Sequence, residues 1–275
     1  MLIQITNKCL MGCPHCMDDA TPDGGIMDFD TYKNALKLAK DTECGIVMIS
    51  GGEPTCHPRF LDFCKECSGQ GLRFCVCTNG MWLGDVKGEW KFERVAKLPG
   101  FMGAQIYSNP KWYRLHDETV AKYKADERRW EDLGVRLDTS EITGMLDIGR
   151  AKTCDRAIEE TKASKYHCSC LKTHVTAAQC LSMKMFMRIM FVQCGYCKPL
   201  VDWKGDVHAS ESWLCQSFGN VNSDSPDTIF VNIRKGRPCG KCIPCQRYLE
   251  EDSQKMRAAR LLLGQQKEGD KKWLN

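Results

Sequence analysis

The first half of the sequence alternates short apolar runs with amphipathic stretches, which restricts the folds open to it. The apolar runs predict β-strands at 2–6, 45–50, 73–77, 102–107 and 135–139. The stretches between them predict helices at 29–40, 58–69 and 117–132. Asp28 is a plausible N-cap for the first helix, and Pro58 lies near the start of the second. This alternation is typical of a parallel sheet, and its spacing predicts an α/β fold, an open partial (β/α)6 barrel similar to a TIM barrel.

Three cysteines directly after the first predicted strand, Cys9, Cys13 and Cys16, form a C-x3-C-x2-C pattern. Each thiolate can bind a different iron of one 4Fe-4S cube, and with no fourth cysteine nearby one iron has no protein ligand. Zinc is the alternative, but structural zinc usually takes paired ligands that close a tetrahedron. His15 lies inside the loop, too close to its cysteine neighbours to complete that set easily. The cysteine loop, residues 9–16, therefore predicts an iron–sulfur cluster with an open iron.

A second motif, Ser50-Gly51-Gly52-Glu53-Pro54, follows the second predicted strand. Two glycines let the backbone approach a ligand closely, and a carboxylate beside them can accept hydrogen bonds from an ammonium group. The motif alone would be a turn. The two motifs lie about one βα unit apart, and together they resemble the radical S-adenosylmethionine (radical SAM) superfamily.

This resemblance implies a set of cofactor contacts. In that family three cysteines hold the cluster, the amine and carboxylate of S-adenosylmethionine chelate the open iron, and the GGE segment binds the amine. Cys9, Cys13 and Cys16 would then be cluster ligands. The implied contacts to S-adenosylmethionine in this segment are Gly51, Gly52, Glu53 and Pro54.

Further residues at predicted strand ends extend the resemblance. Thr78 and Asn79 follow the third strand, Ser108 follows the fourth, and Arg150 follows the fifth within a GRA segment. The resemblance implies cofactor contacts for all four. Thr78, Asn79, Ser108 and the downstream His116 are each also compatible with a simple turn cap. Arg150 can pair with the cofactor carboxylate or form a structural ion pair.

The second half of the sequence is rich in cysteine. Cys239, Cys242 and Cys245 have the compact spacing that bacterial ferredoxins use for three ligands of a cluster, with the fourth supplied from far away in sequence. Cys197 and Cys215 are the candidates for that fourth ligand. The pattern predicts an auxiliary 4Fe-4S cluster.

A predicted β-hairpin at 199–207 lies between the two candidate fourth ligands. This order of features resembles the SPASM or shorter twitch extension of radical SAM enzymes, which carries auxiliary clusters. A full SPASM domain needs more ligands, and its interval from the hairpin glycine to the next cysteine is shorter, so one auxiliary cluster is favoured over two. The alternative is a zinc ribbon held by Cys194, Cys197, Cys239 and Cys242.

The length of 275 residues allows one large domain with a small appendage. We expect a radical SAM core over 1–155, a connecting segment over 156–190, an auxiliary iron–sulfur domain over 191–248 and a C-terminal helix and tail over 249–275. Nineteen cysteines, without a signal segment or a membrane-spanning apolar run, predict a reducing cytoplasm. The net charge of +4 gives no indication of nucleic acid as a partner.

Other cysteines and a methionine run have a simpler interpretation. Core packing is expected for the methionine-rich run 183–190 and for six cysteines in or beside predicted barrel elements. These six are Cys44, Cys56, Cys64, Cys67, Cys75 and Cys77.

The resemblance implies an enzyme that cleaves S-adenosylmethionine reductively to a 5'-deoxyadenosyl radical and abstracts hydrogen from a substrate. The electron would come from an external donor such as flavodoxin or ferredoxin. Modification of a ribosomal peptide is favoured by the extension. Against it, the sequence begins at the first predicted strand, without the leader-binding domain that many peptide-modifying members carry in front. A twitch-type dehydrogenase of a small alcohol or sugar is the alternative enzyme, and a zinc-ribbon binding module is the alternative of another class.

Overall fold

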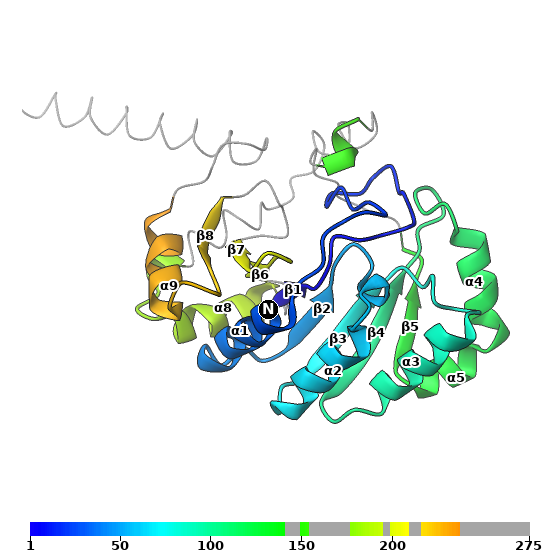
Figure 1. The fold of residues 1–275 in the computed structure, drawn as a ribbon, viewed down its shortest axis with the longest axis horizontal. Coiled ribbons are helices and arrows are strands. Elements are labelled where there is room, and N and C mark those ends of the chain that lie inside the picture. Colours follow the sequence, from blue (N-terminus) through cyan, green and yellow to red (C-terminus); the bar gives the residue numbers. More distant parts are fainter. Residues whose placement is uncertain (141–148, 154–176, 195–198, 209–215, 237–275) are drawn as a thin grey trace, which may run out of the picture.

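The computed structural model describes residues 1–140, 149–153, 177–194, 199–208 and 216–236 (Figure 1). An eight-stranded sheet runs through its centre in the order β5-β4-β3-β2-β1-β6-β7-β8. The strands are β1 (Leu2–Gln4), β2 (Val47–Ser50), β3 (Phe74–Thr78), β4 (Phe101–Tyr107), β5 (Val135–Asp138), β6 (Leu200–Val201), β7 (Asp206–His208) and β8 (Ser217–Asn220). Strands β1 to β6 pair in parallel, whereas β7 and β8 pair antiparallel. This open, mostly parallel sheet confirms the predicted α/β fold with an unclosed barrel.

The helices that follow the first two strands agree closely with the sequence. Helix α1 (Phe29–Asp41) begins at the predicted cap, because Asp28 Oδ1 accepts the backbone N–H of Thr31 at 2.9 Å. Helix α2 (Phe60–Gly69) begins two residues after Pro58. Helix α3 (Val86–Ala96) was not predicted, since its first turn contains Gly88, a poor helix former. Its cap compensates, because Asp85 Oδ2 accepts the Gly88 N–H at 2.8 Å.

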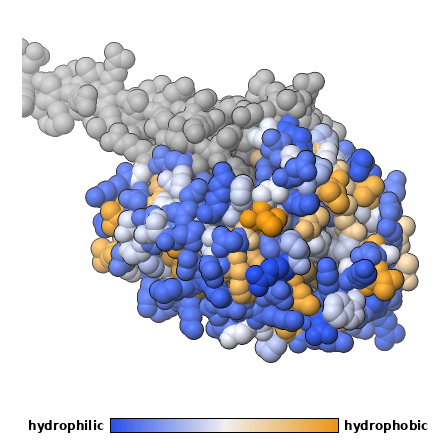
Figure 2. Space-filling view, in the orientation of Figure 1, coloured by the Kyte–Doolittle hydropathy of each residue, from blue (hydrophilic) through white to orange (hydrophobic). Residues whose placement is uncertain are grey.

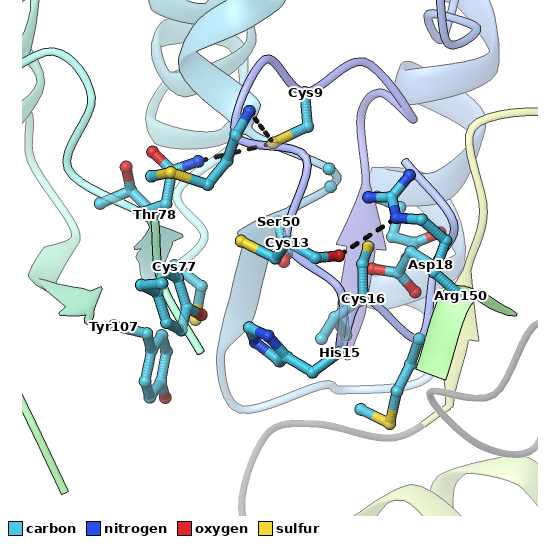
Figure 3. Close-up of a pocket in the computed structure, with 18 of the residues that line it drawn as sticks. Cys9, Cys13, His15, Cys16, Asp18, Ser50, Cys77, Thr78, Tyr107 and Arg150 are labelled. Atoms are coloured by element: carbon cyan, nitrogen blue, oxygen red, sulfur yellow. Dashed lines mark hydrogen bonds between the residues drawn. The ribbon is translucent and has the colours of Figure 1, made fainter. Parts of the chain in front are cut away.

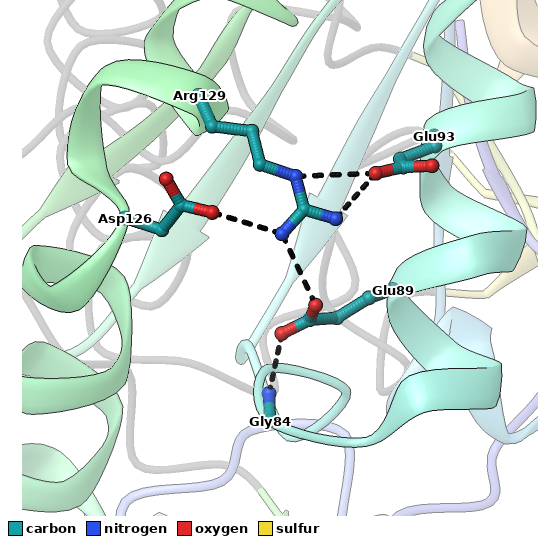
Figure 4. Close-up of polar contacts among 5 residues, drawn as sticks. All are labelled: Gly84, Glu89, Glu93, Asp126 and Arg129. Atoms are coloured by element: carbon teal, nitrogen blue, oxygen red, sulfur yellow. Dashed lines mark hydrogen bonds and ion pairs between the residues drawn. The ribbon is translucent and has the colours of Figure 1, made fainter.

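The prediction of one helix over 117–132 is wrong. The structure has α4 (His116–Ala125) and α5 (Glu127–Asp132), separated at Asp126, whose φ of −142° lies outside the helical region. Arg129 of α5 then turns toward α3 (Figure 4). Its guanidinium contacts Glu93, Glu89 and Asp126 at the same time. The break at Asp126 thus accompanies an ion-pair network that ties α5 to α3.

The two faces of the sheet are packed differently. One face, with Ile3, Ile49 and Val76, joins the buried faces of the helices in a single large core. Leu2, Met48 and Leu200 on neighbouring strands form a separate small cluster, as expected when side chains alternate between faces. Hydrophilic side chains dominate the molecular surface in the view of Figure 2, with hydrophobic ones scattered among them. The small cluster matters for function because it forms part of the cavity described below.

The second half adds a hairpin and two helices to the sheet. The predicted hairpin is confirmed: β6 and β7 pair antiparallel, and Gly205 at the turn has a φ of +89°, which favours glycine. Helix α8 (Met183–Cys194) contains the methionine-rich run, and its Met183 and Met187 are buried in the large core as expected. Met185, by contrast, is exposed, so core packing is wrong for that residue. Helix α9 (Pro226–Lys235) packs against β8. Among the described residues, no helix has the length and apolar character needed to cross a membrane.

The predicted auxiliary-cluster ligands lie outside the described residues. This applies to Cys197, Cys215, Cys239, Cys242 and Cys245. The described part of the chain contributes only the hairpin between the first two of them.

Candidate functional site

A cavity of about 460 Å³ lies at the C-terminal ends of the central strands (Figure 3). The last residues of four neighbouring strands line it, namely Gln4, Ser50, Thr78 and Tyr107. In barrels of this type, active sites usually lie at the C-terminal ends of the parallel strands. The cavity also has the size of a typical small-molecule site.

The three cysteines of the cysteine loop line this cavity together (Figure 3). Cys9 and Cys13 are buried, and Cys16 is half-buried. Backbone N–H groups point at two of the sulfurs, from Met11 to Cys9 Sγ at 3.4 Å and from Ala20 to Cys16 Sγ at 3.4 Å. Such donors stabilise a thiolate, which is the form that binds metal.

Burial raises the pKa of all three thiols. Cys13 is raised to a pKa of about 12, first by burial and then by the neighbouring Cys9 and Cys16. Burial is also the largest cause for Cys9 and Cys16. A positively charged centre must therefore compensate if the three are to be thiolates together, and metal binding would release their protons.

Three thiol side chains around one cavity are a donor set that suits an iron–sulfur cube. Within the described ranges, no group of three or more His, Cys, Asp or Glu side chains is gathered closely enough to hold one metal ion. The ligands of a cube bind different irons, so three sulfurs around one cavity satisfy it without converging on one point.

The two glycines after β2 bring this strand close to the cysteine loop. The backbone N–H of Gly52 donates to Thr6 O at 2.8 Å, and that of Glu53 donates to Lys8 O at 2.9 Å. A Cβ on Gly52 would lie 2.8 Å from Lys8 O. The glycines therefore permit a close approach, as expected. Gly51 and Gly52 also line the cavity, which is where their predicted cofactor contacts would be made.

The Glu53 side chain is part of a buried hydrogen-bond network between two strand ends. It is fully buried and does not line the cavity. Its Oε1 accepts hydrogen bonds from Thr55 N, Thr55 Oγ1 and Thr78 Oγ1, and its Oε2 accepts one from Asn79 N at 2.7 Å. Pro54 is buried at the first position of a short 3-10 helix and is also outside the cavity lining. Glu53 thus joins the ends of β2 and β3.

Thr78 and Asn79 line the cavity and belong to the same network. The Thr78 hydroxyl donates to Glu53 Oε1 at 2.8 Å and accepts from the Trp82 indole N–H at 3.1 Å. The Asn79 side chain donates from Nδ2 to Cys9 Sγ at 3.6 Å. The hydrogen-bonded chain therefore runs from the GGEP segment through β3 to a predicted cluster ligand.

Arg150 contacts the cysteine loop. Its Nε donates to Cys13 O at 3.1 Å (Figure 3). Its Nη1 donates to Ala20 O at 2.8 Å and pairs with Asp19 at 3.3 Å. The guanidinium thereby joins two carbonyls seven positions apart in sequence. The sequence left two roles open for Arg150, a pair with the cofactor carboxylate and a structural ion pair. The structure contains an ion pair, with Asp19. Arg150 also lines the cavity, where a carboxylate of a bound molecule would meet it.

Ser108 is not part of the cavity lining. Its side chain is buried, with Oγ 3.1 Å from His116 Nδ1, and its backbone N–H donates to Asp138 O at 2.9 Å. These contacts join β4, α4 and β5. They give Ser108 a structural role between these elements.

Several cavity residues were not identified from the sequence. His15 is buried beside Tyr113, with ring centroids 5.0 Å apart, and burial, followed by Arg150, lowers its pKa to about 4. Gln4 and Cys77 also line the cavity. Cys77 packs against an apolar cluster, as expected, and has this second position as well. For Gln4 and Cys77 the sequence did contain a signal, because side chains alternate between the two faces of a strand. Tyr113 lies in a connection and gave no such signal.

Comparison with known proteins shows where the similarity is concentrated. Residues 3–101 match the family model of the Radical SAM superfamily. A tungsten-containing aldehyde ferredoxin oxidoreductase cofactor-modifying protein of Pyrococcus furiosus is 35% identical over 88 residues, which cover 31% of this chain and 25% of that protein. A PqqA peptide cyclase of Methylorubrum extorquens is 29% identical over 83 residues, covering 30% of this chain and 22% of the cyclase. The match thus spans about a quarter of the length of these relatives.

Solved structures extend the similarity of fold to most of the chain. Streptococcus suis SuiB bound to S-adenosylmethionine superposes with a TM-score of 0.52 at 16% identity, covering 88% of this chain and 70% of SuiB. SuiB bound to its precursor peptide SuiA gives a TM-score of 0.53 at 15% identity, covering 88% and 68%. At this identity the likeness concerns the fold. Together with the family match, it confirms the resemblance inferred from the cysteine loop and the GGEP segment.

Proposed function

We propose that this chain is a radical SAM enzyme that cleaves S-adenosylmethionine reductively and abstracts hydrogen from a peptide. One observation carries the proposal: Cys9, Cys13 and Cys16 line the same cavity as Gly51 and Gly52. When bound, the cluster and S-adenosylmethionine would supply an electron and a 5'-deoxyadenosyl radical. The protein would bind, orient and shield the reactants from water.

The described residues have distinct tasks in this proposal. The three cysteines hold the cluster, and the donors from Met11 and Ala20 stabilise two of the thiolates. Gly51 and Gly52 leave room for the amino group of S-adenosylmethionine beside the backbone. Thr78 and Asn79 complete that wall of the cavity.

The apolar side of the cavity supports an uncharged group as the reacting part of the substrate. Leu2, Met48 and Leu200 line one side and carry no polar atoms on their side chains apart from the thioether. Gln4 adds one amide, whose Oε1 is buried without a hydrogen-bond partner in the described structure. An apolar wall with one neutral polar group suits an amino-acid side chain of a peptide.

A peptide is favoured over the small alcohol or sugar by the relatives. One relative is named a peptide cyclase, and SuiB has been solved with a precursor peptide. A zinc-ribbon binding module is not favoured, because the match to the family model includes both the cysteine loop and the GGEP segment. The oxidoreductase class belongs to the proposal, with the substrate radical giving up one electron to the proposed auxiliary cluster.

An auxiliary 4Fe-4S cluster in the second half is part of the same proposal. Its ligands would be Cys239, Cys242 and Cys245, with Cys197 or Cys215 as the fourth. The confirmed hairpin between Cys197 and Cys215 supports the resemblance to the SPASM or twitch extension on which this assignment rests.

The proposed setting is a reducing cytoplasm with flavodoxin or ferredoxin as the electron donor. All ten cysteines whose side chains are described are free thiols. Free thiols suit a compartment in which they remain available for metal binding.

The function can be tested with anaerobically purified, reconstituted protein. We expect bound iron and sulfide, and formation of 5'-deoxyadenosine from S-adenosylmethionine with dithionite. Candidate peptides encoded near the gene, with deuterium at aliphatic positions, should transfer the label into 5'-deoxyadenosine. Labelled sugars or alcohols are the comparison, and transfer from these alone would contradict the peptide assignment. Zinc without iron would contradict the enzyme class.

A further inference from the structure

The orientation of the Asn79 carboxamide is fixed by two different contacts. Asn79 follows β3 and is 7% exposed. Its Oδ1 accepts the backbone N–H of Met81 at 3.0 Å, and its Nδ2 lies 3.6 Å from Cys9 Sγ. Because Oδ1 is engaged by a donor that cannot accept, the NH₂ end must be the one that faces the sulfur. The direction of the amide therefore follows from the network.

The backbone of Asn79 is also held in place. Its N–H donates to Glu53 Oε2 at 2.7 Å, while the adjacent Thr78 hydroxyl donates to Oε1 of the same carboxylate at 2.8 Å. Glu53 is fully buried and follows the glycines that contact the cysteine loop. The donor at Cys9 is thus attached to a rigid connection rather than to a free side chain.

A hydrogen bond to a cluster ligand acts on the electron affinity of the cluster. Reduction adds negative charge, part of which resides on the ligand sulfurs, so an N–H donor stabilises the reduced form more than the oxidised form. Such bonds are among the factors that set cluster potentials. The effect is larger in a buried site, where the effective dielectric constant is low.

We propose that Asn79 is a positioning residue that raises the reduction potential of the cluster through its hydrogen bond to Cys9. The inference rests on the proposed function, since it requires a cluster at the cysteine loop. It assigns the Asn79 amide to the ligand sulfur instead of to S-adenosylmethionine. The higher reduction potential should therefore be present already in protein without bound S-adenosylmethionine.

A matched control lies at the end of the neighbouring strand. Asn109, after β4, is 3% exposed, and its Oδ1 accepts the N–H of Lys111 at 2.9 Å, two positions along, as Asn79 does with Met81. Its Nδ2, however, donates to Ser140 O at 2.9 Å. The two asparagines share residue type, burial and turn geometry, and differ in whether the amide reaches a predicted cluster ligand.

The test is a redox titration, followed by electron paramagnetic resonance without S-adenosylmethionine, of wild type, Asn79→Ser, Asn79→Asp and Asn109→Ser. Serine keeps a hydroxyl for the turn but is too short to reach Cys9. The Asn79→Asp variant preserves the shape of the side chain but adds a charge, so it accompanies Asn79→Ser and is not used alone. The signal of a protein lacking Cys9, Cys13 and Cys16 is subtracted, so that any auxiliary cluster does not contribute.

We expect Asn79→Ser to disfavour one-electron reduction about tenfold, a shift of about 59 mV to more negative potential. Asn79→Asp should shift it further in the same direction, and Asn109→Ser should leave it at the wild-type value. The proposal would be overturned by an unchanged potential in Asn79→Ser or by an equal shift in Asn109→Ser. Loss of the cluster from both Asn79 variants would also overturn it. Wild type without a cluster signal would instead overturn the proposed function.

Discussion

The ends of β3 and β4 repeat one local structure: a hydroxyl residue followed by an asparagine, in Thr78-Asn79 and Ser108-Asn109. Both pairs are buried at the same edge of the sheet. The first pair is connected through Glu53 to the GGEP segment and lines the cavity. The second bonds to β5, to Ser140 just beyond it and to α4, and stays outside the cavity lining. Similar residues at two neighbouring strand ends thus divide into a pair that lines the cavity and a pair that connects elements of the fold.

This division predicts which substitutions affect chemistry and which affect only stability. The largest loss of activity should come from replacing Cys9, Cys13 and Cys16 together with Ala. We expect loss of one 4Fe-4S cluster and of all 5'-deoxyadenosine formation, because Cys77 would be the one cysteine left in the described cavity lining. Iron analysis and a dithionite-driven cleavage assay measure this. Continued 5'-deoxyadenosine formation would show that the site has been misassigned.

The same variant reports on the second half of the chain. About four irons should remain, the content of one cube. Retained zinc without iron would support the ribbon alternative.

Arg150 should have the next largest effect, because it holds two carbonyls of the segment that carries the cysteines. Arg150→Ala should lose iron to a chelator about 10–100-fold faster, the usual cost of removing a residue that orients metal ligands. Arg150→Lys should recover little, since an ammonium group lacks the planar fork that spans both carbonyls. The measurement is the rate of iron release.

Arg129→Ala is the matched control. Arg129 joins α5 to α3 through Glu89 and Glu93, away from the cysteine loop. It should leave iron release unchanged and affect thermal stability alone. Equal iron loss from both variants would show that Arg150 has no special relation to the loop.

Many of the residues that line the cavity could be predicted, because their sequence signals are local. The cysteine loop and the GGEP segment are short motifs, and the strand ends follow from apolar runs. The inward direction of Glu53 could not be predicted, because its partners Thr78 and Asn79 are 25 and 26 residues away. The contact of Arg150 with Cys13 spans 137 residues. Helix α3 was missed because its stability depends on a cap and on burial of Phe92 and not on its sequence alone.

Glu53→Gln distinguishes the sequence-based role of Glu53 from the role indicated by its contacts. Direct contact with the ammonium group predicts weaker cofactor binding, by about 1.5–3 kcal/mol, with iron content intact. The buried network predicts in addition a loss of stability of about 1–3 kcal/mol, since an amide NH₂ would face the donors of Thr78 or Asn79. Binding titration and thermal unfolding are both measured.

We expect both effects in Glu53→Gln, because the network holds the wall of the cavity. Weaker binding at unchanged stability would favour direct contact. Unchanged affinity would contradict any role of Glu53 in the cofactor site.

Ser108→Ala should have the smallest effect on function and so defines the limit of the site. Its hydroxyl contacts His116 within 3.1 Å and nothing in the cavity lining. Loss of one buried hydrogen bond should lower the free energy of unfolding by about 1 kcal/mol, while the affinity for S-adenosylmethionine and the iron content stay at wild-type values. Thr78→Ala removes the corresponding hydroxyl on β3, where it donates to Glu53 and lines the cavity. Because Thr78 belongs to the wall, its substitution should weaken cofactor binding as well as stability. Equal losses of affinity in the two variants would mean that the cofactor site extends across the end of β4, as the sequence had implied for Ser108.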